Sequence, residues 1–132
     1  MERAAALGLA PVRVTAASLP SDAGERLRTF VEEGAHGTMD WLARDPERRA
    51  DPRRLWPEAR TAIVCGLNYG PPDDPLPDLA RTDRGYLSVY ARNRDYHDVL
   101  KGRLKELAQL LASRAGADVK VFVDTAPILE KP

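Results

Sequence analysis

The chain has little cysteine, no excess of charge and no long apolar run. Its single cysteine, Cys65, excludes an internal disulfide and cannot alone hold an iron–sulfur cluster, which takes about four thiolates. Basic and acidic residues number 20 each, so no net charge favours binding to nucleic acid or membranes. No apolar stretch approaches the ~20 residues of a membrane span, and the amino terminus lacks a secretory pattern. We therefore expect a cytoplasmic protein with no membrane partner.

Common motifs of catalysis are also missing. The sequence has no dinucleotide fingerprint, no phosphate-binding glycine loop and no Gly-x-Ser-x-Gly nucleophile elbow. His36 and His97 are far apart and neither has a partner at metal-ligand spacing, which predicts no metal site. We interpret His97 as a solvated or capping residue, His36 as a loop residue and Cys65 as a buried strand residue.

What is present favours an α/β domain. A hydrophobic share of 43% over 132 residues supports one core, so we expect residues 1–132 to form a single domain. Thr61–Tyr69 is nearly continuous in apolar residues and predicts a strand covered on both faces. Val119–Val123 predicts a second strand. Between them, Asp95 opens the best helix, which ends at Gly116 and places four leucines on one stripe: Leu100, Leu104, Leu107 and Leu111.

Shorter elements complete the pattern. We expect a helix over 2–8, a strand over 11–15, a helix from Ser21-Asp22 to Gly34, a short helix capped by Thr38, a charged loop over 44–54 with a helical turn at 52–55, an extended segment over 86–90, and a helix opening at Pro127. The fold class is therefore α/β, with α+β as the alternative. The small sheet has flanking helices and is incomplete at the carboxyl end, which suggests a fragment of a longer protein.

Asp124 is the strongest candidate for chemistry. It directly follows the predicted strand 119–123, and open α/β sheets commonly place ligand-binding groups at such strand ends. The alternative is a structural role, since an acidic residue shortly before Pro127 can cap a helix. Capping favours the charged carboxylate, whereas donating a proton requires the neutral acid. Thr125 could take the capping role and leave Asp124 free.

Two arginine-rich segments allow both a functional and a structural reading. The arginines within 44–54 can form an anion or amide clamp, or a solvated loop balanced by neighbouring acids. Residues 88–97 mix tyrosines and arginines ahead of a helix, where polar ligands often bind. The ordinary alternative is two tyrosines packed on the core and two surface arginines.

Five segments in order resemble the amino-terminal region of epoxyqueuosine reductase. They cover most of the chain from residue 30 onward, and their order is more specific than any one of them: Gly34–Leu42, Glu47–Pro52, Leu55–Arg60, Tyr90–His97 and Val123–Pro132. The resemblance implies a cobalamin-dependent, iron–sulfur oxidoreductase of queuosine biosynthesis, which reduces epoxyqueuosine to queuosine in tRNA. It also implies a cobalamin-binding region, followed in the family by a ferredoxin-like module with two [4Fe–4S] clusters and a helical-repeat tail.

The same resemblance implies roles for three residues. Asp124 matches the family's proton donor, and Asp124, Arg49 and Ser88 fall at cobalamin-contact positions. The chain departs from the family by stopping at Pro132, before any cluster cysteine, so we expect the isolated chain to be inactive and to bind cobalamin weakly or not at all. We also expect a monomer. The alternatives are a stand-alone, non-catalytic module that binds a corrinoid or a partner chain, and an unrelated α/β domain in which Asp124 only caps a helix.

Overall fold

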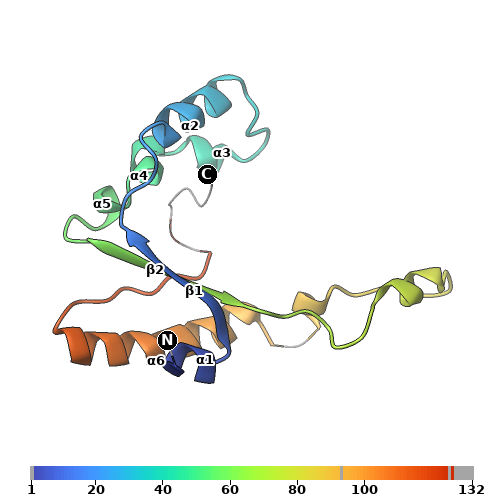
Figure 1. Ribbon diagram of the computed structural model, residues 1–132. Coiled ribbons are helices and arrows are strands. Elements are labelled where there is room, and N and C mark those ends of the chain that lie inside the picture. Colours follow the sequence, from blue (N-terminus) through green and yellow to red (C-terminus); the bar gives the residue numbers. More distant parts are fainter. Residues whose placement is uncertain (1, 93, 125, 127–132) are drawn as a thin grey trace. The chain divides into compact units, whose positions relative to one another are not determined.

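Helices and a small sheet together make a mixed α/β structure, as the sequence predicts (Figure 1). The computed structural model describes residues 2–92, 94–124 and 126. In the described part, strands β1 and β2 pair as a two-stranded antiparallel sheet. The elements in chain order are α1 (Glu2–Ala6), β1 (Leu9–Ala16), α2 (Ala23–Glu32), α3 (Asp40–Ala43), α4 (Pro46–Ala50), α5 (Pro52–Leu55), β2 (Thr61–Leu67), the 3₁₀ helices η1 (Leu76–Ala80) and η2 (Val89–Ala91), and α6 (Tyr96–Ala115).

The chain divides into two compact units. The first contains the residues up to Val12 together with Val64–Asp124, and the second is built on Arg13–Ile63. The first unit therefore holds α1 and α6, and the second holds α2 to α5. The division into units does not test whether residues 1–132 fold as a single domain, which stays a prediction.

The core of the first unit forms where α1, β1 and α6 meet. Ala4, Leu9 and Leu107 are its buried members, and Leu9 is only 1% exposed. The other three leucines of the α6 stripe pack against them, which confirms the spacing read from the sequence. An ion pair between Arg3 of α1 and Glu106 of α6 lies across the same contact. Burial of these apolar side chains is the main source of stability here.

Both ends of α6 are as the sequence predicts. At the start, the Asp95 carboxylate accepts the backbone N–H of His97 at 2.9 Å, which is the usual N-cap bond. At the end, Gly116 has φ 60° and donates its N–H to the Ala112 carbonyl at 2.9 Å. Glycine is favoured there because it adopts left-handed backbone angles without the steric cost of a Cβ atom.

The second unit packs α2 against α4. Ala23 and Leu27 of α2 are buried, and Arg28 of α2 pairs with Glu47 of α4 at 2.8 Å. The prediction of a loop before residue 52 was wrong, because Pro46–Ala50 is helical. Asp45 caps this helix by accepting the Arg48 N–H at 3.2 Å, and Pro46 sits in its first turn, where proline is favoured. Thr38 caps nothing either, since Met39 holds the N-cap position of α3.

Three expectations about extended segments were also wrong. Val119–Val123, all of it described, forms no strand, because β1 pairs only with β2 and no further strand lies beside it in the described sheet. Residues 86–90 are not continuously extended, since η2 begins at Val89. Strand β2 is not covered on both faces, because Val64 is 59% exposed in a sheet that gives it one neighbour. The helix expected at Pro127 lies outside the described residues.

None of the described helices combines the length and the apolar composition that a membrane crossing requires.

Candidate functional site

Asp124 lies on an unusual backbone at the carboxyl end of the first unit. Its φ of 51° is in the left-handed region, which few residues other than glycine adopt and which asparagine and aspartate tolerate best. Its side chain is exposed, and Oδ2 accepts the hydroxyl of Tyr96 at 2.7 Å. Asp45 has the same conformation as the N-cap of α4, so it is the contacts of Asp124 that distinguish it. Because 119–123 is not a strand, contacts with the start of α6 hold Asp124, rather than a sheet edge.

The hydrogen bond to Asp124 raises the pKa of Tyr96, because ionising the phenol would remove its proton from that bond and place a second negative charge beside the carboxylate. Since the folded-state pKa is the higher one, the bond stabilises the fold below the ordinary tyrosine pKa. This contribution is lost as pH rises through the folded value.

We therefore expect Asp124→Gly, which removes the acceptor and suits the left-handed backbone, to lower the pKa of Tyr96 toward its ordinary value. The measurement is an alkaline titration of tyrosinate absorbance, with a Tyr96→Phe variant subtracted to isolate this one of the four tyrosines. Superimposable curves for wild type and Asp124→Gly would show that the hydrogen bond does not persist in solution.

His97 lies beside the same carboxylate. Its Nδ1 is 2.9 Å from Asp95 Oδ1, and its Nε2 is 4.0 Å from Asp124 Oδ2. The imidazole ring stacks on the ring of Tyr96, with centroids 4.1 Å apart. We expected His97 to be solvated or to take part in capping. Its backbone N–H is indeed capped by Asp95, and in addition its ring lies between the carboxylates of Asp95 and Asp124.

Aromatic and polar residues continue from this cluster toward η2. Tyr90 of η2 meets Tyr96 edge to face, with centroids 6.4 Å apart. Ser88, a predicted contact residue, precedes η2, and its side chain is exposed. Tyr90 therefore contacts the residue that binds Asp124, and Ser88 is two positions before Tyr90 in the sequence. All of these residues belong to the first unit.

Arg49 belongs to the second unit, so it is not part of the Asp124 cluster within the first. Its guanidinium donates from Nη2 to the Trp41 carbonyl at 2.7 Å and lies 5.0 Å from the centre of the Trp41 ring. Its Nε is buried and has no hydrogen-bond acceptor among the described residues. A buried donor without an acceptor costs free energy, so this atom suits an oxygen from a bound molecule.

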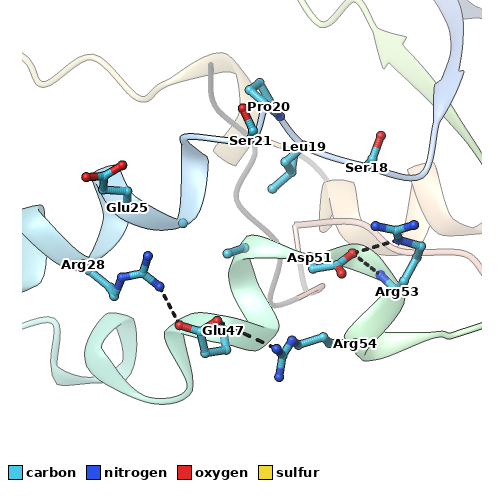
Figure 2. A pocket seen from close by; sticks show the side chains of 12 residues that line it. Ser18, Leu19, Pro20, Ser21, Glu25, Arg28, Glu47, Asp51, Arg53 and Arg54 are labelled. Atoms are coloured by element: carbon cyan, nitrogen blue, oxygen red, sulfur yellow. Dashed lines mark hydrogen bonds and ion pairs between the residues drawn. The ribbon is translucent and has the colours of Figure 1, made fainter.

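A cleft of about 310 Å³ also opens in the second unit, between the start of α2 and helices α4 and α5 (Figure 2). Figure 2 shows its charged side chains bound to one another: Glu47 lies between Arg28 and Arg54, and Asp51 faces Arg53. The backbone N–H of Arg53 lowers the pKa of Asp51. For Arg53 and Arg54, these pairings favour arginines balanced by neighbouring acids over an anion clamp.

Metal binding finds no support in the described residues. No three histidine, cysteine or acidic side chains within them gather closely enough to hold an ion. Cys65 lies on β2 at intermediate exposure against the first core, and burial raises the pKa of its thiol. A thiol held protonated is a poor nucleophile, in agreement with a structural role.

The sequence did not identify Tyr96 and His97 as partners of Asp124. They lie 28 and 27 positions away along the chain, and a single sequence gives no periodicity that would bring them together. The local signal was the acidic–aromatic–histidine order at the start of α6, which helix capping alone could explain.

Comparison with known proteins places this mixed α/β chain among relatives that are named epoxyqueuosine reductase. A family model described as "Epoxyqueuosine reductase QueG, DUF1730" matches residues 49–125, more than half of the chain. The chain belongs to this family, and the resemblance read from its sequence is confirmed.

Individual relatives agree. The epoxyqueuosine reductase of Escherichia coli (strain K12) is 36% identical over 128 residues, covering 96% of this chain and 34% of its own length. That of Vibrio cholerae is 38% identical over 108 residues, covering 80% and 29%. A crystal structure of selenomethionine-labelled epoxyqueuosine reductase superposes with a TM-score of 0.73 at 26% identity, over 98% of this chain and 34% of the other. The chain thus spans about a third of the length of these proteins.

Proposed function

We propose that this chain is the part of an epoxyqueuosine reductase that binds cobalamin and supplies the acid for epoxide reduction in tRNA. The observation that carries the proposal is the exposed Asp124 carboxylate, held on a left-handed backbone by Tyr96 at 2.7 Å. Family membership supports the reaction class, and a cytoplasmic, monomeric protein with tRNA as its substrate belongs to the same proposal.

Each unit, taken by itself, offers groups that suit part of a corrinoid. Cobalamin carries amide and phosphate oxygens around its ring, and the buried Arg49 Nε lacks an acceptor of this kind. Ser88 adds an exposed hydroxyl, and Tyr90 and Tyr96 offer aromatic surface near Asp124. When bound and reduced, cobalamin supplies electrons to the epoxide. The [4Fe–4S] clusters that the family uses need thiolates beyond the single cysteine of this chain.

Asp124 has a defined task in this reaction. Converting an epoxide to an alkene takes two electrons and two protons and releases the oxygen as water. The departing oxygen becomes basic as its bond to carbon breaks, so an acid within hydrogen-bond distance lowers the barrier. Tyr96 then stabilises the carboxylate that remains, through the hydrogen bond seen here.

Cobalamin binding tests the cofactor part of the proposal. We expect Arg49→Met to weaken binding by about 10-fold or more in the full-length reductase that contains this segment, because one charge-assisted hydrogen bond is lost. Arg54→Met is the matched control, since Arg54 is exposed and only loosely paired with Glu47. Absorbance titration gives both dissociation constants. Equal values for Arg49→Met and wild type would remove Arg49 from the cofactor site.

A further inference from the structure

The proton demand of the reaction exceeds what Asp124 can supply. The reduction consumes two protons, and one carboxyl group holds one. Asp124 must therefore take up a proton again within or after each turnover, and a neighbouring group that exchanges protons near neutral pH would speed that step. This step rests on the proposed function of Asp124.

His97 is the neighbouring group with suitable chemistry. Imidazole is the side chain that ordinarily changes charge between about pH 5 and 8. The Nε2 of His97 is 4.0 Å from Asp124 Oδ2, and a movement of about 1 Å, or one bridging water, would connect them. The side chain is 40% exposed, so solvent can return a proton to it.

The orientation of the ring also suits this transfer. Asp95 Oδ1 lies 2.9 Å from Nδ1, so Nδ1 donates its proton there and Nε2 is left as the atom on the Asp124 side. Stacking on Tyr96, whose hydroxyl donates to the same Asp124 oxygen, limits rotation of the ring. The ionisable groups that face His97 are the carboxylates of Asp95 and Asp124 and the phenol of Tyr96.

We propose that His97 returns a proton to Asp124 during turnover, with Asp95 as the residue that positions its ring. The O–H bond of Asp124 breaks as the epoxide oxygen is protonated. The N–H bond of His97 at Nε2 then breaks as the carboxyl group is restored, and solvent water reprotonates Nε2. A bound corrinoid would supply the electron pair, so the exchange between His97 and Asp124 moves protons only.

The first test follows the two histidines of the 132-residue chain by NMR. We expect Asp124→Asn to change the chemical shift of the His97 Hε1 proton, because the ring loses the carboxylate that lies 4.0 Å from Nε2. Asp95→Asn should also change it, because Nδ1 loses its hydrogen-bond acceptor. The ring signal of His36, in the second unit, is the internal control and should not change. An unchanged His97 signal in Asp124→Asn would overturn the proposal.

The second test measures turnover of epoxyqueuosine tRNA by the full-length reductase. His97→Gln should lower kcat by about 100-fold at neutral pH, with cobalamin binding unchanged, because proton transfer from a positioned group is worth roughly that much. Added imidazole should restore part of the rate in His97→Ala. Wild-type turnover in His97→Gln overturns the relay. If that variant is active while Asp124→Asn is not, only the relay falls, whereas an active Asp124→Asn removes the proposed acid itself.

Discussion

Replacing Asp124 with asparagine is expected to lower turnover of epoxyqueuosine tRNA by about 1,000-fold, within the range that general acids contribute. Asparagine keeps the shape of the side chain and tolerates the left-handed backbone at φ 51°, so the variant tests the proton rather than the fold. Its amide can still accept the Tyr96 hydroxyl through Oδ1. The loss should therefore appear in kcat, with cobalamin binding close to that of wild type.

Asp118→Asn is the matched control for this variant. Asp118 lies in the same segment, six positions before Asp124, is exposed and sits on no helix or strand. The reductase with Asp118→Asn should turn over epoxyqueuosine tRNA with the kcat of wild type. The proposed acid is wrong if Asp124→Asn retains near wild-type kcat. If instead cobalamin binding is lost, Asp124 serves the cofactor site and not the proton transfer.

Leu9→Ala is expected to destabilise the first unit by about 3 kcal/mol. Leu9 is 1% exposed and packs against Ala4 and Leu107, so the substitution removes buried methyl groups and leaves a cavity. Urea unfolding followed by far-ultraviolet circular dichroism is the suitable measurement, because α6 is the longest described helix and belongs to this unit. The urea concentration at the midpoint should fall by about 1–3 M for a small domain.

Leu79→Ala provides the comparison for Leu9→Ala. Leu79 lies on η1 in the same unit and is 62% exposed, so its truncation should change stability by no more than about 0.5 kcal/mol. Both tryptophans, Trp41 and Trp56, lie in the second unit and report separately on that part of the chain. Equal destabilisation by the two leucine substitutions would contradict the core described here.

Helix α6 and strand β2 could be predicted because their signals are local. The leucine spacing of α6, its Asp95 cap and its Gly116 stop all lie within one segment and agree with one another. The failed strand at Val119–Val123 shows the opposite case. Its β-branched residues suit a strand, but a strand also needs a neighbour to accept its hydrogen bonds, and nothing in a 5-residue segment specifies one.

The candidate site was predictable only in part, for the same reason. Asp124 was recognised through its motif, but its nearest partners come from the beginning of α6. Tyr96 and His97 approach Asp124 only in the folded chain, and the spacing of residues in the sequence does not predict such a contact. Arg49 could also be predicted as a cobalamin contact, from the resemblance to the family. The feature that makes it interesting, a buried Nε without an acceptor, depends on how Trp41 packs over the guanidinium.

The left-handed backbone of Asp124 restricts which amino acids evolution or a saturation library could place there. Glutamate preserves the acid, yet it adopts such angles far less readily, and its extra methylene would displace the carboxyl group from the Tyr96 hydroxyl. Glycine satisfies the backbone and removes the acid. Selection for activity at this codon should therefore return aspartate almost alone, whereas selection for folding should also accept asparagine and glycine.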